Sequence, residues 1–240
     1  MMMTFRCVMG ITLVTLALTT PGAARAETFG YFGKTGPAHW GELSPEWETC
    51  NTGEIQSPVD FRHFSSQRKF SIDYGSTKGE IFNNGHTIEL ETKGNNTFTL
   101  DGIAYELAQI HFHTASEHTV KGRGFEMEMH LVHMSAGGSI AVIGVFLKRG
   151  PGNGSLAPIF ENLPDDGGVH HPLDALFDPD TFLPNSRKHY SYAGSLTTPP
   201  CTEGIQWIVM AEPMSVSDVD IAQFAERIHF NARPVQRQLK

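Results

Sequence analysis

The most informative feature of the sequence is a set of histidines in two strand-like stretches, Gln109-Ile-His111-Phe-His113 and, further along the chain, Glu126-Met-Glu128-Met-His130-Leu-Val-His133. Side chains alternate between the two faces of a β-strand, so His111 and His113 share one face. If the two stretches pair as neighbouring antiparallel strands, His130 lies across from them on that face. Three neutral imidazoles suit Zn²⁺, and three protein ligands leave open the fourth position of a catalytic site. The sequence therefore predicts a zinc site on a β-sheet.

The residues two positions before the histidines support this prediction. Gln109 precedes His111 by two residues and Glu128 precedes His130 by two, so each shares a face with its histidine. A metal-bound imidazole needs an acceptor for its second ring N–H, and an amide or carboxylate oxygen can serve as one. We therefore expect Gln109 and Glu128 to orient the ligands.

Other histidines have simpler explanations. His133 follows His130 by three residues and should face the opposite side of the strand, so we interpret it as a structural histidine. We interpret His118 in the same way. The pair His170-His171 lies in a stretch rich in Gly and Pro and is expected to be solvated.

Residues 1–26 have the features of a secretory signal peptide. Arg6 precedes an apolar stretch over 8–18, Pro21-Gly22 interrupts the chain, and Ala24-Arg25-Ala26 provides a small-residue cleavage site. The apolar stretch is too short to span a membrane, and no other stretch is apolar enough to do so. We therefore expect an exported protein, either periplasmic or secreted.

The composition predicts one exported domain over residues 27–240, long enough for a sizeable core. The formal net charge is −8 and no basic cluster is present, which argues against nucleic acid as a partner. Cys7 is lost with the signal peptide, so Cys50 and Cys201 remain. Two cysteines in an exported protein predict one disulfide, with two buried free thiols as the alternative.

The remaining pattern predicts a mainly β protein. Strand-like stretches alternate with turns rich in Gly and Asn, and residues 140–147 are apolar enough for a central strand. The expected strands cover 81–82, 87–90, 97–100, 103–112, 125–134, 140–147 and 204–210. Two short helices are expected, one that begins at Ser155 and one that begins at Ser217.

The chain resembles the α-class carbonic anhydrases. The resemblance runs in family order from about Phe29 to Pro234, through Gly36-Pro-Ala-His-Trp40, Gln56-Ser-Pro-Val-Asp60, Asn83-Asn-Gly-His86, His111-Phe-His113, Ser116-Glu117-His118, Glu128-Met-His130, Gly194-Ser-Leu-Thr-Thr-Pro-Pro-Cys201 and Asn231-Ala-Arg-Pro234. It implies a single domain with a large, mostly antiparallel, twisted central sheet, a few short peripheral helices, and a conical cleft that ends at Zn²⁺. It also implies reversible hydration of carbon dioxide to bicarbonate and a proton, by attack of zinc-bound hydroxide.

The resemblance also implies roles for single residues. Thr197 and Glu117 match the pair that orients the hydroxide, and His86 matches a histidine that shuttles protons. The further matches are Val132, Val142, Leu196 and Trp207 as an apolar patch for carbon dioxide, Thr198 as an anion contact, Tyr31 and Asn84 as organisers of a water chain, and the Asn231 carbonyl as the acceptor that orients His113.

Two further features follow from the resemblance. Phe29 stands where Trp is common in the family, so we expect the packing of the N-terminal arm to differ while the catalytic site does not. The Ser57–Pro58 and Pro199–Pro200 peptide bonds are expected to be cis.

Three other functions stay open. Another zinc hydrolase, such as an esterase, would usually need a larger cleft and an acid for the leaving group. A non-catalytic binding module related to the family would be expected to lack a zinc histidine, and a periplasmic zinc carrier would not need Thr197, Glu117 and His86. The sequence does not determine the oligomeric state, and a homodimer stays open.

Overall fold

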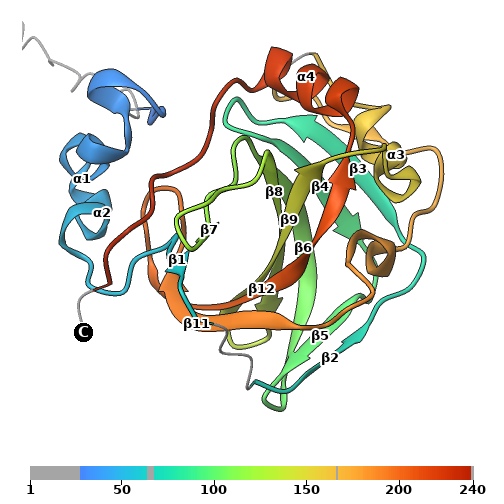
Figure 1. The fold of residues 1–240 in the computed structure, drawn as a ribbon, viewed down its shortest axis with the longest axis horizontal. Coiled ribbons are helices and arrows are strands. Elements are labelled where there is room, and N and C mark those ends of the chain that lie inside the picture. The colour runs from blue at the N-terminus through green and yellow to red at the C-terminus, as the bar shows by residue number, and fades with distance from the viewer. Residues whose placement is uncertain (1–27, 64–67, 166, 239–240) are drawn as a thin grey trace, which may run out of the picture.

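The computed structural model describes residues 28–63, 68–165 and 167–238 and consists mainly of one twisted sheet with short helices around it (Figure 1). The predicted signal peptide, residues 1–26, lies outside the described residues. The ten strands of the sheet are β2 (Phe70–Asp73), β3 (Lys78–Asn83), β4 (Ile88–Lys93), β5 (Thr97–Leu100), β6 (Ile103–His113), β8 (Met127–Ser135), β9 (Ile140–Arg149), β10 (His171–Pro172), β11 (His189–Ser195) and β12 (Glu203–Val216).

The order of the strands confirms the predicted class. They lie in the order β10-β3-β4-β6-β8-β9-β12-β11, and β5 pairs with both β6 and β2. β9 and β12 run parallel, whereas the other neighbouring strands of this sheet run antiparallel. A separate small sheet joins β1 (Asp60–Phe61) to β7 (Thr119–Val120) in parallel. The protein is a single, mainly β domain with a large, mostly antiparallel central sheet.

The pairing of β6 with β8 positions the histidines. The two strands are antiparallel, and their register places His111 directly opposite His130. The next strand, β9, is buried from Ala141 to Leu147, as its apolar sequence predicted for a central strand. Packing on both faces of β9 therefore holds β8, and with it His130, in the interior of the molecule.

Three strands of the large sheet were not predicted: β2, β10 and β11. β10 has only two residues, which is too short for an alternating pattern. β11 lies at one end of the strand order, and most of its residues are polar or small. Edge strands of this kind gain their structure from a partner strand, here β12, rather than from a hydrophobic pattern of their own.

The two predicted helices are present. The first is a turn of 3-10 helix, η4 (Gly154–Leu156), followed by α3 (Ala157–Phe160); the side chain of Asn153, not Ser155, caps its start. The second is α4 (Asp218–Arg227), which Ser217 and Asp220 begin with a reciprocal capping box. Phe224 lies on its buried face and packs into the main core.

Short helices that were not predicted form the N-terminal arm: η1 (Gly33–Thr35), η2 (Pro37–His39), α1 (Trp40–Leu43), η3 (Pro45–Trp47) and α2 (Thr49–Thr52). A further turn, η5 (Pro179–Phe182), follows β10. In Figure 1 the arm lies to one side of the sheet, and the segment after α4 runs beside it. Trp40 is fully buried in the arm, and its indole N–H donates to the carbonyls of Gly30 and Thr35.

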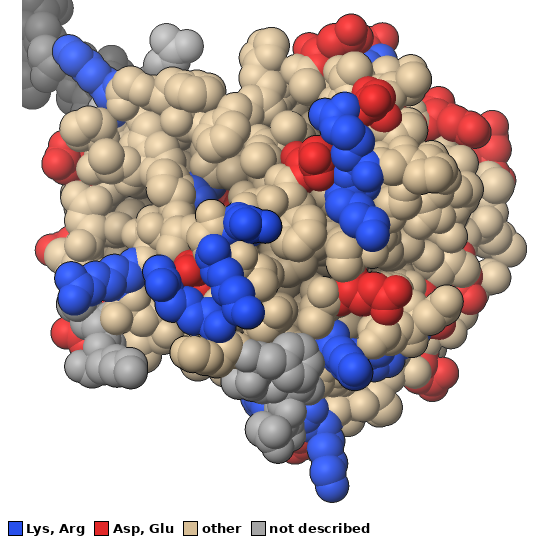
Figure 2. All heavy atoms as spheres, in the orientation of Figure 1, with Lys and Arg blue, Asp and Glu red and all other residues tan. Residues whose placement is uncertain are grey.

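The surface carries charges of both signs. On the face in Figure 2, acidic and basic side chains lie among a larger area of other residues. No helix within the described part of the chain is long and apolar enough to cross a membrane.

Candidate metal centre and active site

The three predicted ligands lie together at the centre of the sheet. The ring centroids of His111, His113 and His130 are 4.5 to 5.1 Å apart, and one nitrogen of each ring lies within 4.8 Å of the others. His111 Nε2 and His130 Nδ1 face each other at 3.3 Å. The Nε2 atom of His113 is buried and has no hydrogen-bond partner. A buried nitrogen without a hydrogen-bond partner is energetically unfavourable, and such a nitrogen is suited to binding a metal ion.

The opposite nitrogen of each ring is held by an oxygen. An acceptor at one ring nitrogen fixes the proton there and leaves the other nitrogen free for a metal. The three contacts are His111 Nδ1 with Gln109 Oε1 at 2.8 Å, His113 Nδ1 with the Asn231 carbonyl at 2.9 Å, and His130 Nε2 with Glu128 Oε1 at 3.0 Å. The structure thus brings each predicted acceptor to its predicted histidine.

The electrostatic environment favours the neutral forms of His111 and His113. Burial lowers the pKa of His111, and the neighbouring imidazoles lower it further. Burial also lowers the pKa of His113, although the nearby Glu117 carboxylate acts in the opposite direction. A neutral imidazole is the form that binds a metal ion, so both shifts favour metal binding at neutral pH.

Glu128 is held by more groups than the sequence indicated. Burial would raise its pKa, but contacts with His118 and His130 outweigh burial and hold the pKa well below its usual range. His118 Nδ1 lies 2.7 Å from Glu128 Oε1, and the backbone N–H groups of Glu117 and His118 donate to Oε2. His118 is a buried structural histidine, as interpreted, but its contact is with the carboxylate that orients a candidate ligand.

Sequence reasoning missed two residues that continue this network. The Tyr192 hydroxyl lies 2.6 Å from His118 Nε2 and donates to Ser57 Oγ at 2.8 Å. Ser57 Oγ in turn accepts a hydrogen bond from the Ser195 backbone N–H. These residues come from distant parts of the chain, and no local motif links Tyr192 to the histidines.

Glu117 and Thr197 both lie in the buried interior, but the expected hydrogen bond between them is absent from the described contacts. Glu117 Oε1 accepts a hydrogen bond from the Arg233 backbone N–H at 2.8 Å. Its Oε2 atom is buried without a hydrogen-bond partner and lies 3.6 Å from His113 Nε2. Thr197 lies on the loop between β11 and β12 and is 6% exposed.

His86 lies at the turn between β3 and β4. Asn84 Oδ1 accepts hydrogen bonds from the backbone N–H groups of His86 and Thr87, so this side chain shapes the turn. Asn84 itself is exposed. The His86 imidazole stacks on the Phe29 ring, with centroids 3.9 Å apart and an interplanar angle of 9°. Burial lowers the pKa of His86.

The stacking of Phe29 on His86 corrects one expectation. We expected the unusual residue at position 29 to affect only the packing of the N-terminal arm. Phe29 does pack edge-on against Trp40, but its face covers the candidate proton shuttle. The arm therefore forms part of the environment of the site.

The predicted apolar patch is assembled beside the histidines. Val142 and Trp207 are buried in one cluster, and Val132 and Leu196 pack against it. The Trp207 ring meets the His130 ring edge-on, with centroids 4.9 Å apart. Thr198 is half-buried on the same loop as Thr197, and its carbonyl accepts a hydrogen bond from the Cys201 N–H.

Tyr31 lies close to the catalytic candidates. Burial raises its pKa, and the Glu117 carboxylate raises it further, which keeps the phenol protonated. Tyr31 also packs edge-on against Trp40. A partly buried tyrosine with a neutral hydroxyl is suited to holding water by hydrogen bonds.

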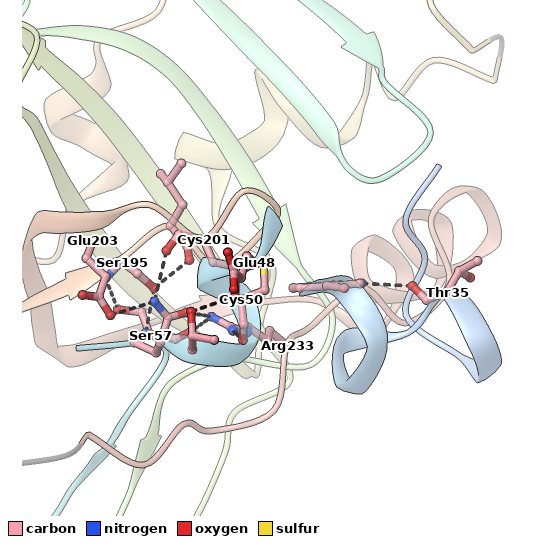
Figure 3. The surroundings of a disulfide bond; sticks show 12 residues. Thr35, Glu48, Cys50, Ser57, Ser195, Cys201, Glu203 and Arg233 are labelled. Atoms are coloured by element: carbon pink, nitrogen blue, oxygen red, sulfur yellow. Dashed lines mark hydrogen bonds between the residues drawn. A yellow bond between two sulfur atoms is a disulfide. The ribbon is translucent and has the colours of Figure 1, made fainter. Parts of the chain in front are cut away.

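The predicted disulfide joins Cys50 to Cys201, with the two Cα atoms 5.0 Å apart (Figure 3). The Arg233 guanidinium lies beside it and donates to the carbonyls of Cys50 and Ser57 and to Gln56 Oε1. It also lies over the Trp40 ring. The Ser57–Pro58 and Pro199–Pro200 bonds are cis, as expected, and the Thr114–Ala115 bond is cis as well.

Fold and site together define a class of β-sheet enzymes with a centre of three histidines. The chain belongs to the α-carbonic anhydrase family, because the family model for eukaryotic-type carbonic anhydrases matches residues 35–240. A carbonic anhydrase of Nostoc sp. is 40% identical over 227 residues, which cover 91% of this chain and 86% of the relative. A carbonic anhydrase of Neisseria gonorrhoeae is 38% identical over 234 residues, or 94% and 92% of the two chains.

Solved structures agree with this family. The α-carbonic anhydrase from Thermovibrio ammonificans, in complex with the inhibitor sulfanilamide, is 41% identical with a TM-score of 0.85, covering 88% of this chain and 96% of that chain. Dioscorin complexed with ascorbate is 31% identical with a TM-score of 0.81, covering 88% and 95%. The protein is thus an enzyme of the carbonic anhydrase family, whose general reaction is the hydration of carbon dioxide.

Proposed function

We propose that the protein is an exported zinc carbonic anhydrase, a lyase that converts carbon dioxide reversibly to bicarbonate and a proton. The observation that carries the proposal is the buried Nε2 of His113, which has no hydrogen-bond partner and lies in a group with one nitrogen of each of the two other imidazoles within 4.8 Å. His111 Nε2, His113 Nε2 and His130 Nδ1 would hold Zn²⁺. When bound, zinc lowers the pKa of a water to about 7, as in carbonic anhydrases generally, and so supplies a nucleophile at neutral pH.

Glu117 and Thr197 would orient the nucleophile. The Oε2 atom of Glu117 is a buried carboxylate oxygen without a hydrogen-bond partner, and the Thr197 hydroxyl would donate to it. The Thr197 oxygen then has only its lone pairs available and can accept a hydrogen bond from a group that lies beside it. This fixes the direction of that group and is a positioning role.

The apolar patch would hold the substrate. Carbon dioxide is small and has no net dipole, so it is weakly hydrated. Apolar side chains such as Val142 and Trp207 can therefore bind it with little loss of hydration. Bicarbonate is charged and gains nothing from these side chains, which favours its release. Thr198 is the half-buried polar group on the adjacent loop and would contact the departing anion.

His86 would accept the proton that each hydration releases and pass it to buffer. It lies on a turn rather than in the sheet, and a neutral imidazole is available because burial lowers its pKa. Tyr31 would order the water between the interior and His86. Asn84 would act through the turn that it shapes, because its side-chain oxygen Oδ1 accepts hydrogen bonds from the backbone N–H groups of His86 and Thr87.

Export is the proposed location. Residues 1–26 would be the signal peptide and residues 27–240 the catalytic domain, in the periplasm or outside the cell. The Cys50–Cys201 disulfide supports this proposal, because disulfides persist in oxidising compartments.

A homodimer, which the sequence left open, would be tested by light scattering of the purified protein.

His113→Ala tests the metal centre. The variant loses one of three ligands, so most of the zinc and most of the stopped-flow carbon dioxide hydration should be lost while the protein stays folded. Exposed His63 is a matched control, and His63→Ala should keep both. Tight, stoichiometric zinc in folded His113→Ala would show that the assigned centre is wrong.

A further inference from the structure

A second group of metal-ligating side chains lies outside the three-histidine centre. It consists of Glu80 on β3, Glu91 on β4 and His170 in the loop before β10. One ligand atom of each residue lies within 4.8 Å of the others. His170 is exposed, as expected, with 42% of its side chain accessible, and its ring stacks on Phe82 with centroids 4.0 Å apart.

The strand register places this group on the catalytic face of the sheet. Glu80 lies directly opposite Glu91, and Glu91 lies directly opposite Gln109, which holds the His111 ring. Residues directly opposite on antiparallel strands share a face. The group is therefore on the same face as His111. Two carboxylates directly opposite each other repel, so a cation between or beside them stabilises this arrangement.

The contacts within the group leave room for that cation. His170 Nδ1 lies 3.8 Å from Glu80 Oε2 and 3.7 Å from Glu91 Oε2, and both separations are too long for hydrogen bonds. In the buried group of His118, Glu128 and His130, by contrast, the separations are 2.7 and 3.0 Å and the contacts are hydrogen bonds. Donor atoms that share one metal at bond lengths of about 2.1 Å lie roughly 3 to 3.5 Å apart.

One existing cation occupies only part of the group. The Lys93 ammonium contacts Glu80 Oε1, which leaves Oε2 of the same carboxylate toward His170. Glu91 Oε2 and His170 Nδ1 lie 3.7 Å apart, and both are within 4.8 Å of a Glu80 oxygen. The Phe82 ring restrains the His170 imidazole, so less side-chain freedom is lost when a metal binds.

We propose that Glu80, Glu91 and His170 form a second site for a divalent transition metal, on the same face of the sheet as the catalytic centre. One imidazole with two carboxylates suits Zn²⁺ and Co²⁺, with water completing the coordination shell. The site is exposed and has a lysine next to it, so it binds more weakly than the buried centre.

Equilibrium dialysis against Zn²⁺ and Co²⁺, with the bound metal counted, tests the second site. The wild-type protein should bind two equivalents, the second at least tenfold more weakly than the first. His170→Ala and Glu91→Gln should each bind one equivalent, whereas the surface control His63→Ala should bind two. A single equivalent in the wild type overturns the proposal, as does a second equivalent that survives in both variants.

Two further variants separate this site from the catalytic one. In His113→Ala the weaker equivalent should persist, and adding His170→Ala should remove it, whether or not the protein hydrates carbon dioxide. Lys93→Met removes the competing charge and should tighten the weaker equivalent several-fold. If Lys93→Met leaves its affinity unchanged, the metal does not bind at this group and the proposal fails.

Discussion

Two buried atoms without hydrogen-bond partners lie side by side in the site, Nε2 of His113 and Oε2 of Glu117. Leaving a buried polar atom unpaired costs about 1–3 kcal/mol, so such atoms are rare unless they have another role. Every other ring nitrogen of the three candidate ligands has a neighbour. These two unpaired atoms therefore indicate where the metal and the reacting groups would meet.

His86 gives a prediction at this scale. His86→Ala should lower kcat by at least about tenfold, because the released proton loses its carrier. The value of kcat/KM, which reports the hydration step, should change little, and added imidazole should restore part of kcat. Stopped-flow assays in weak buffer measure all three quantities. A parallel fall of kcat/KM without rescue by imidazole would contradict the shuttle role.

Phe29 gives a second prediction. It covers His86 and contributes to the burial that lowers the pKa of this imidazole. Phe29→Ala should therefore move the midpoint of the His86 titration, followed by NMR, upward toward 6.5. Phe32→Ala is a matched control, since Phe32 lies on the same arm but is 67% exposed. An unchanged midpoint in Phe29→Ala would mean that other groups set the pKa.

At the scale of the element, β8 carries different chemistry on its two faces. His130 points to the candidate metal, and His133, three residues later, points to the opposite side. There it contacts the Tyr74 hydroxyl, and its Nδ1 lies 3.3 Å from the Ala141 carbonyl. Burial lowers the pKa of His133 to about 3, so this histidine is neutral in the folded protein at neutral pH.

The burial of His133 should make the fold sensitive to acid. An unfolded histidine has a pKa of about 6.5, so between pH 6.5 and pH 3 the unfolded chain binds a proton that the folded chain does not. His133 thus contributes stability that is fully present above pH 6.5 and is lost as the pH falls toward 3. In this range the free energy of unfolding decreases by at most about 1.4 kcal/mol per pH unit because of His133.

His133→Gln removes the titrating group and should flatten the fall in the free energy of unfolding between pH 6.5 and pH 4. Urea denaturation of the metal-free protein, with His63→Gln as the control, measures the slope. Equal slopes for His133→Gln and the wild type would refute the assignment to His133.

At the scale of the whole molecule, Arg233 connects parts that are distant in sequence. Its guanidinium donates to the carbonyl of Cys50 in the N-terminal arm, and its backbone N–H donates to Glu117 in the site. Cys50 is bonded to Cys201 (Figure 3), which lies on the same loop as Thr197. The arm, the loop that carries Thr197 and the C-terminal segment therefore meet at one buried point.

Removal of the disulfide tests this connection. The bond links residues 151 positions apart, and in the chain-entropy model a loop of this length contributes about 5 kcal/mol. Replacing both cysteines by serine should lower the free energy of unfolding in urea by up to this amount. Wild-type protein treated with a reductant should match the variant. Mass spectrometry that finds two free thiols in the untreated wild type would contradict the bond itself.

The sequence by itself determined the strands that carry the site, because apolar alternation and closely spaced histidines are local signals. It indicated β6, β8 and β9, the side chains of Gln109 and Glu128 that reach the nearest histidine, and the start of α4 at Ser217. Motif resemblance added the residues that lie far away in sequence, such as Asn231 and Thr197. These parts could be predicted because each rests on spacing within a strand or on a whole motif.

Only the tertiary structure decided the contacts between distant segments. The stacking of Phe29 on His86, the link from His118 to Tyr192 and the position of His170 beside Glu80 and Glu91 leave no periodic signal. The edge strand β11 and the helices of the arm likewise depend on their partners. The physical reason is that a local pattern reports which face of an element is buried, whereas a contact across the fold depends on how all the elements pack together.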